Sequence, residues 1–194
     1  MRNHARAVLA CDFFVAATAT FRMVYVFVVL DVGTRRITHW NTTEHPTAEW
    51  TAQQFRMIVA GDGAHQYVIH DRDSIYSEGV DRTLAAMGLT VLRMPVQAPQ
   101  ANAFCERLVG TIRRECLDFL IPLTERHLRQ IMSRWVTHYN RGRRPHSSLG
   151  PGLPDPPPDG VVESNGHKLP IGHRVVATPI MGGLHHEYRL EAAA

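Results

Sequence analysis

The chain has 194 residues, of which 44% are hydrophobic and 20% charged, a composition that favours a globular fold and excludes the disordered class. The formal net charge of +3 is too small to indicate a nucleic-acid partner by itself. No apolar run approaches the ~18 residues of a membrane span, and the start of the chain lacks the long apolar stretch of a secretory signal. We therefore expect a cytoplasmic protein with no membrane partner.

The first half of the chain predicts a meander of three strands followed by alternating helices and strands. The apolar segment 5–14 predicts a strand that ends near Asp12, and two further strands are expected over 23–32 and 35–42. Pro46 suits the first turn of a helix over 46–59, whose apolar face combines four side chains: Trp50, Gln54, Met57 and Ile58. The elements expected next are a strand over 66–70, a helix over 78–87 and a strand over 89–93.

The second half predicts two long helices and a separate tail. An irregular loop over 95–100 precedes a helix over 102–120, and Thr124 suits the N-cap of a helix that reaches residue 139. This order of elements predicts an α/β fold with a mixed five-stranded sheet flanked by helices, the order of a ribonuclease-H-like fold. We expect three regions: a core domain over 1–150, a Pro-rich linker over 151–160, and a tail over 161–194 with room for a small hairpin.

Cysteine and arginine are distributed unevenly. Cys11, Cys105 and Cys116 lack metal-ligand spacing, which predicts reduced, buried thiols. Nine arginines and four acidic residues fall between 105 and 150, a local excess of +5, whereas Lys168 is the only lysine. Arginine binds phosphate bidentately, so this segment is compatible with a nucleic-acid partner. A genome that favours arginine codons explains the same bias.

Three carboxylates are candidates for a divalent-cation site. Asp12 and Asp71 each follow an apolar strand, and strand ends in α/β sheets gather at one edge. Glu106 lies on a predicted helix about 200° around the helix axis from Leu108, so it faces away from the core. The apolar stripe of this helix is expected to consist of Leu108, Ile112 and Phe119. Arg113 is seven residues after Glu106 and returns to within about 20° of it, and Gly110 leaves a gap on that face. Each residue alone is more often structural than catalytic.

Four motifs, in this order, resemble the retroviral-type integrase core of bacterial insertion-sequence transposases. The resemblance runs from about residue 3 to 154, and its most specific part is the glutamate helix. The motifs are ACDFF at 10–14, VIHDRDSIYS at 68–77, PVQAPQANAFCERLVGTIRRECLDFL at 95–120 and HYNRGRRPHSSLG at 138–150.

The resemblance implies the catalytic and metal-binding set Asp12, Asp71 and Glu106. Asp73 competes with Asp71, which lies five residues before Tyr76, where the family places an aromatic residue. The implied cofactor is Mg²⁺ or Mn²⁺, with two ions stabilising the attacking and leaving oxygens of phosphodiester transfer.

The implied DNA-binding residues lie on and around the glutamate helix. Asn102 opens this helix, and Arg107, Arg113 and Arg114 are expected near the DNA backbone. An ordinary helix cap and a solvated basic face are the alternatives. The implied partners are duplex DNA, as element ends and target, and further copies of the chain in a homo-oligomer.

Two histidine-containing segments could ligate a metal, and the first could also bind DNA, but neither is taken as a site. His138, Asn140 and the Arg-Pro-His segment 144–146 are expected to form a helix end, although three residues separate Asn140 from Arg144 where the family usually has two. The pair His185-His186 lacks further metal-ligand partners in the sequence and is treated as incidental.

Family members usually carry a helix-turn-helix region before the core, and none fits ahead of Ala10. We therefore expect either a truncated reading frame or a core that uses a separate DNA-binding partner. Three functions follow from the sequence: an active DNA strand transferase, a non-catalytic DNA-binding remnant, and a nuclease of the same fold.

Overall fold

A computed structural model describes residues 7–59, 65–71, 75–92, 103–141, 154–155, 169 and 171–193. The chain divides into two compact units, Met1–Gln130 and Ile131–Ala194. Four features predicted from sequence lie outside the described residues: the loop over 95–100, Asp73, Asn102 and the Arg-Pro-His segment 144–146. The same holds for most of the linker over 151–160, so the expected domain boundaries stay predictions.

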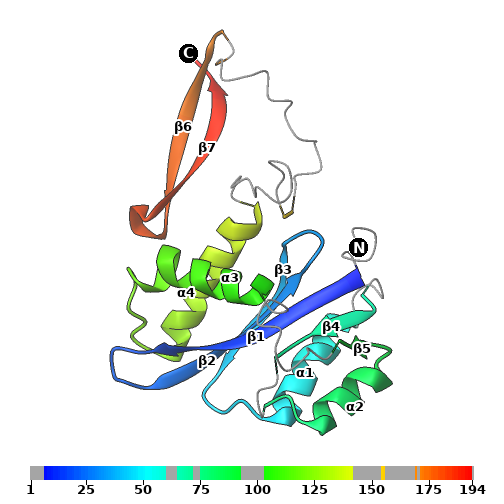
Figure 1. Cartoon of the computed structure of the whole chain (residues 1–194). Helices are drawn as coiled ribbons and strands as arrows, with labels where there is room; N and C mark the ends of the chain where they lie inside the picture. Colours follow the sequence, from blue (N-terminus) through cyan, green and yellow to red (C-terminus); the bar gives the residue numbers. More distant parts are fainter. Residues whose placement is uncertain are drawn as a thin grey trace. The chain divides into compact units, whose positions relative to one another are not determined.

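The first unit contains a five-stranded sheet with the order β3-β2-β1-β4-β5 (Figure 1). β1, β2 and β3 pair antiparallel, whereas β4 runs parallel to β1 and β5 parallel to β4. The predicted mixed five-stranded sheet is therefore confirmed. The strands are β1 (Val8–Ala17), β2 (Met23–Asp31), β3 (Ile37–Thr43), β4 (Tyr67–Ile69) and β5 (Thr90–Val91).

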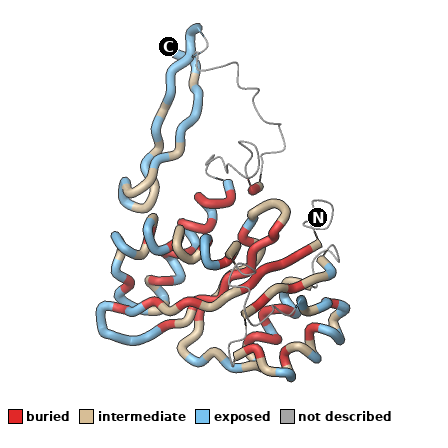
Figure 2. Tube along the Cα trace, in the orientation of Figure 1, coloured by how far each residue is buried: buried red, intermediate tan, exposed pale blue. Residues whose placement is uncertain are grey.

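The two central strands β1 and β2 are apolar along most of their length because both faces of the sheet are covered. On one face, β1 and β2 pack against the helices α1 (Ala48–Val59) and α2 (Glu78–Ala86), with Phe27, Phe55 and Leu84 fully buried. The other face packs against the helix α3 (Ala103–Ile112). Figure 2 shows the buried residues following these strands through the unit.

Local capping places the start of α1 later than the sequence indicated. The hydroxyl of Thr47 accepts a hydrogen bond from the backbone N–H of Trp50 at 3.2 Å, so Thr47 is the N-cap and Pro46 precedes it. The prediction of Pro46 in the first turn is therefore wrong. Met57 is also wrongly assigned to the buried face, because its side chain is 59% exposed while Phe55 is fully buried.

The predicted helix over 102–120 is interrupted. α3 ends at Ile112 and continues as a π-helical segment, η2 (Arg113–Leu117). The wider π turn shifts the apolar stripe, so Cys116 is buried and Phe119, predicted to belong to the stripe, is 64% exposed. The next helix, α4 (Glu125–Arg141), begins as predicted, because the Thr124 hydroxyl accepts a hydrogen bond from the N–H of His127 at 3.2 Å.

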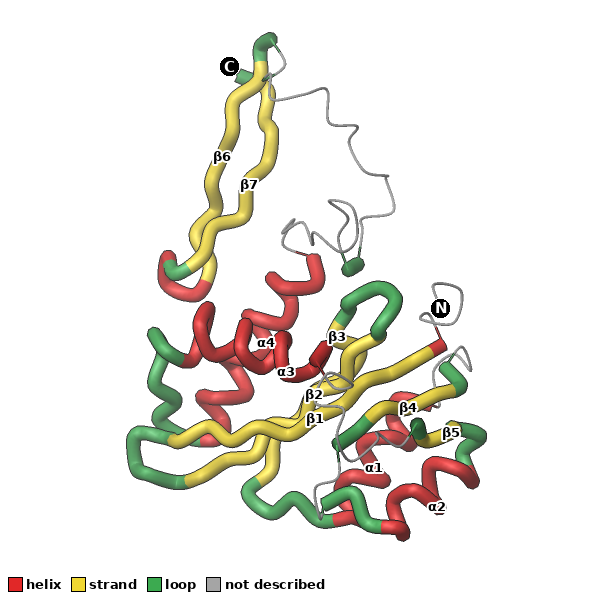
Figure 3. Tube along the Cα trace, viewed as in Figure 1, coloured by secondary structure: helices red, strands yellow, loops and turns green. Residues whose placement is uncertain are grey.

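The second unit contains an antiparallel hairpin of β6 (His173–Ile180) and β7 (His185–Ala192), joined by the short turn η4 (Met181–Gly183) (Figure 3). Val175 pairs with Leu190 across the hairpin, and both side chains are exposed. The hairpin lies in the tail region where the sequence left room for one. Within the described residues, no helix has the length and apolar character needed to cross a membrane.

Candidate active site

Asp12 lies within β1 and not at its end, contrary to the prediction. It is opposite Val28 of β2, and the β1–β2 pairing continues to Ala17. The β1–β4 pairing stops much earlier, at Ala10 and Ile69. Asp12 therefore lies two residues beyond the point where β4 leaves the sheet. One carboxylate oxygen accepts a hydrogen bond from the N–H of Phe13 at 2.8 Å.

Asp71 follows β4 at the position that corresponds to Asp12. The parallel register pairs Leu9 with Val68 and Ala10 with Ile69, and two further residues on each chain give Asp12 and Asp71. Side chains alternate between the faces of a strand, so Asp12 belongs with Ala10 to the face opposite Leu9. Leu9 packs on the α1–α2 side, which leaves Asp12 on the side covered by α3.

Glu106 comes from α3, which packs against β1. The neighbouring Cys105 and Leu108 are buried, whereas Glu106 is exposed, as the helical spacing predicts. The pKa of the Cys105 thiol is raised well above its ordinary value, first by burial and then by electrostatic interaction with Cys11 and with the carboxylates of Asp12, Asp71 and Glu106. The fields of all three candidate carboxylates thus overlap at one buried thiol.

The three carboxylates do not form a closed metal site in this conformation. Among the residues that the structure describes, no group of three or more His, Cys, Asp or Glu side chains is arranged to hold a metal ion. Asp12 and Asp71 each lie two residues beyond the last pair of the β1–β4 ladder, and Glu106 is exposed on α3, which packs against β1. Oxygen ligands of this kind suit a hard divalent cation that keeps several of its waters.

The basic residues around Glu106 have different surroundings. Arg113 donates a hydrogen bond to the carbonyl of Val15 at 3.3 Å, and its guanidinium lies 5.8 Å above the ring of Phe14, so it ties η2 to β1. Arg114 lies over Gly110, where an added Cβ would come within 3.0 Å of Nη1. The gap predicted at Gly110 is therefore covered by Arg114.

Arg107, Arg113 and Arg114 are all exposed on α3 and η2, in the same stretch as Glu106. Their exposure leaves them accessible to a phosphate backbone, and their role in DNA binding stays a prediction. The role of Asn102 stays a prediction too.

His70 is a site neighbour that the sequence analysis missed. Its ring nitrogen Nδ1 lies 2.6 Å from the backbone oxygen of Asp71, and Nε2 lies 3.0 Å from a carboxylate oxygen of Asp81 on α2. The ring stacks on Tyr76 with 4.3 Å between centroids. Its position next to Asp71 is the only signal in the sequence, because nothing in the pattern of α2 singles out Asp81.

Arg35 was also missed. Its guanidinium lies 4.1 Å above the ring of Phe104, two residues before Glu106. Arg35 adopts a left-handed backbone conformation, with a φ of 63°, which is costly for a residue with a long side chain. The β2–β3 turn that contains Arg35 therefore contacts the first turn of the helix that carries Glu106.

The three cysteines are buried thiols, as predicted. Burial raises the pKa of the Cys116 thiol to about 12 and holds the pKa of Cys11 well above its ordinary value. At neutral pH both thiols are therefore protonated and inert as nucleophiles.

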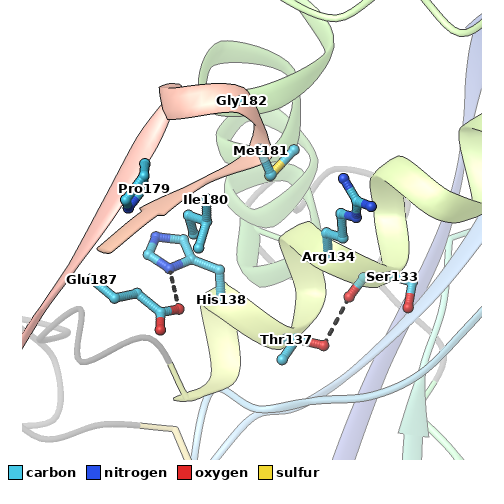
Figure 4. Close-up of a pocket in the computed structure, with 9 residues that line it drawn as sticks. All are labelled: Ser133, Arg134, Thr137, His138, Pro179, Ile180, Met181, Gly182 and Glu187. Carbon is cyan, nitrogen blue, oxygen red and sulfur yellow. Dashed lines mark hydrogen bonds and ion pairs between the residues drawn. The ribbon is translucent and has the colours of Figure 1, made fainter. Parts of the chain in front are cut away.

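The second unit has a hollow of its own, with a volume of about 560 Å³. Figure 4 shows His138 of α4 with its Nδ1 directed at Glu187 of β7, a contact of 3.0 Å. His185 stacks on His138 with 5.1 Å between ring centroids. His185 is thus part of the packing in this unit, a role that the sequence did not indicate. None of the residues that line this hollow is one of the three candidate carboxylates.

Comparisons with known proteins support the second half of the motif series, at 95–120 and 138–150. Residues 87–154 match the integrase core domain family. Over 73 residues the chain is 34% identical to the uncharacterized 31.7 kDa protein of insertion element IS407 from Burkholderia multivorans. The match covers 38% of this chain and 26% of that protein, so the chain spans about a quarter of the length of this relative.

Solved structures share the fold at low sequence identity. A chain of the simian T-cell lymphotropic virus intasome, solved in complex with the PP2A regulatory subunit B56 gamma, has a TM-score of 0.61 at 11% identity, with coverages of 97% of this chain and 70% of that chain. The HTLV-2 integrase catalytic core in complex with magnesium has a TM-score of 0.58 at 12% identity and coverages of 77% and 93%. The catalytic domain of Mos1 mariner transposase has a TM-score of 0.57 at 14% identity, with coverages of 69% and 71%. The predicted ribonuclease-H-like integrase core fold is confirmed.

Proposed function

We propose that this chain, which matches the integrase core domain family over residues 87–154, is a metal-dependent polynucleotidyl transferase of an insertion element. It would cleave donor DNA ends and join the 3′-hydroxyl to target DNA. The observation that carries the proposal is that Asp12 and Asp71 each lie two residues beyond the last pair of the β1–β4 ladder, while α3, which carries Glu106, packs against β1.

Asp12, Asp71 and Glu106 would hold Mg²⁺ or Mn²⁺, in agreement with the magnesium complex of the HTLV-2 core. Two such ions activate the attacking oxygen and stabilise the leaving oxygen in phosphodiester transfer. Asp12 is held within β1 and Asp71 follows the end of β4, whereas Glu106 is exposed on α3. We expect Glu106 to move toward the two aspartates when metal and DNA bind.

Arg107, Arg113, Arg114 and Asn102 would contact the DNA backbone. The proposed partners are duplex DNA, further copies of this chain in a homo-oligomer, and a separate DNA-binding protein that recognises the element ends. The likeness to a chain of a viral intasome supports an assembly of several copies. Binding through phosphates would weaken steeply as salt is raised.

The test is reversal of strand transfer on a branched oligonucleotide that mimics a joined product, in buffer with Mn²⁺ or Mg²⁺. The wild type should release the joined strand, and Asp71→Asn should reduce the release to background. Asp118→Asn is the matched control, because it removes an exposed carboxylate of the same region, after η2, and should act as the wild type does.

Two other functions would give different results. A non-catalytic remnant would bind the branched DNA equally well as wild type and as Asp71→Asn, and neither would release a strand. A nuclease of the same fold would cleave without joining, and an RNA–DNA hybrid offered beside duplex DNA would show which substrate it prefers. The Asp12–Asp71 placement fits both metal-dependent enzymes, whereas the family match over the glutamate helix favours the transferase.

A further inference from the structure

We propose that His70 is a positioning residue that fixes the backbone of Asp71, and with it the orientation of the Asp71 carboxylate toward the metal. The inference rests on the proposed function, because it assigns a support to one of the three proposed metal ligands. It adds two residues, His70 and Asp81, that neither the sequence motifs nor the family match assigns to the site.

The backbone at Asp71 has reached the end of its strand. The β1–β4 register pairs stop at Ile69, two residues earlier, so the regular ladder does not extend to Asp71. The contact of 2.6 Å between His70 Nδ1 and the backbone oxygen of Asp71 holds the backbone carbonyl of Asp71, the proposed metal ligand. The carbonyl carbon and the Cβ of Asp71 are both bonded to its Cα. A rotation of the backbone at this Cα would therefore swing the carboxylate, and a fixed carbonyl opposes that rotation.

The imidazole ring itself is held from two further directions. Asp81, in the first turn of α2, lies 3.0 Å from Nε2, and the Tyr76 ring stacks on the imidazole at an interplanar angle of 13°. His70 and Tyr76 are each only 7% exposed. Tyr76 also belongs to the core that β1, α1 and α2 share. The position of the ring is therefore set by the sheet core and by α2, and the ring transmits that position to Asp71.

Supports of this kind matter because metal ligands need a fixed orientation. Partners that orient a ligand without touching the ion typically change metal affinity or activity by about 10- to 100-fold when they are lost. We expect an effect in the lower part of this range, since His70 acts on the Asp71 backbone and not on the carboxylate.

The chain offers a matched control at the opposite end of β4. His65 precedes the strand, and its Nε2 lies 3.1 Å from a carboxylate oxygen of Asp31. Both side chains of this pair are 12% exposed, against 7% for His70 and 16% for Asp81. The other Asp31 oxygen accepts hydrogen bonds from the turn N–H groups of Gly33 and Thr34. Loss of the His65 pair should therefore cost stability without reaching the proposed ligands.

Two substitutions at His70 separate positioning from simple packing. The amide of Asn reaches roughly the place of Nδ1 and can still donate to the Asp71 carbonyl. The amide of Gln reaches roughly the place of Nε2 and can still donate a hydrogen bond to the Asp81 carboxylate. His70→Asn, His70→Gln and His65→Gln are purified as the full chain, and their Mn²⁺ affinity is measured by electron paramagnetic resonance, with urea denaturation measured in parallel.

We expect His70→Gln to weaken Mn²⁺ binding about 10-fold. The Mn²⁺ affinities of His70→Asn and His65→Gln should stay within about threefold of the wild-type affinity. Equal affinity in His70→Gln and the wild type would overturn the inference while leaving the proposed function intact. Equal losses in His70→Asn and His70→Gln would also overturn it, because they would indicate packing alone. Asp71→Asn is included, and Mn²⁺ binding that is unchanged by that substitution would overturn the proposed function itself.

Discussion

The five-stranded sheet and the β6–β7 hairpin are built from the same kind of element and differ in what covers them. In β2, Val24, Val26 and Val28 are fully buried, because helices pack on both faces of the sheet. In β6, Val175 is 55% exposed although it too is a strand valine with a cross-strand partner. Strand pairing alone therefore does not bury a side chain. The first sheet can hold its side chains at fixed positions because its backbone is packed from both sides.

The edge strand β3 lies between these extremes. Its Thr42 is buried and donates a hydrogen bond to Glu125 at 2.8 Å, and Arg129 donates to the Thr42 carbonyl at 2.6 Å. These contacts come from the start of α4 and cover an edge that would otherwise offer hydrogen bonds to another chain. Polar contacts of partly exposed groups hold this edge, so it should be weaker than the apolar core and sensitive to pH.

The largest effect on stability is expected when a valine is replaced by alanine in the five-stranded sheet, compared with the same replacement in the hairpin. Val29→Ala, at a fully buried position of β2, should lower the free energy of unfolding by about 2–3 kcal/mol, because it removes buried methyl groups and leaves a cavity. Val175→Ala in β6 should cost less than about 1 kcal/mol. Urea denaturation followed by tryptophan fluorescence and by backbone circular dichroism measures both. Similar losses would show that the hairpin is covered in solution.

A smaller effect is expected at the β3 edge, and it should depend on pH. Partial burial acts to raise the pKa of Glu125, but hydrogen bonds from Thr42 and Arg129 together hold it below the ordinary value of 4.5. A lowered pKa stabilises the fold above pH 4.5, and this stabilisation is lost as the pH falls through the folded-state pKa. Glu125→Gln should cost about 0.5–1 kcal/mol at pH 7 and almost nothing at pH 3. A cost that is the same at both pH values would contradict this assignment.

The smallest effect concerns the exposed face of α3. Gly110→Ala should stabilise the helix by up to about 1 kcal/mol, because the neighbouring Arg114 guanidinium is flexible and can shift. The shift should weaken DNA binding a few-fold and reduce the salt dependence by roughly one phosphate contact. Fluorescence anisotropy with labelled duplex DNA at several salt concentrations measures this. In a chain that already carries Arg114→Ala, Gly110→Ala should no longer change DNA binding. If the two substitutions weaken DNA binding additively, Arg114 does not contact DNA.

The sequence predicted the elements better than their ends. The apolar run of β2 and the amphipathic pattern of α4 have strong periodicity, and both elements form with nearly the predicted bounds. The burial of Phe119 was wrongly predicted, because the pattern assumed 3.6 residues per turn and the π-helical segment does not obey it. Asp12 was placed at a strand end because polar residues often mark one. Its strand continues because β2 goes on pairing with it, and this information lies in β2.

The sequence by itself determined the α/β order and the exposure of Glu106, since the order of elements and the spacing along a helix are local properties of the chain; its motifs also made Asp12, Asp71 and Glu106 the candidate site. Only the tertiary structure decided that β1 pairs with β4 and that Ala10 lies opposite Ile69, so that Asp12 and Asp71 each follow the last pair by two residues. It also brought Asp81 to His70 and Arg35 to Phe104. Each of these contacts joins separate elements across the fold, and no local pattern of residues specifies where two elements meet.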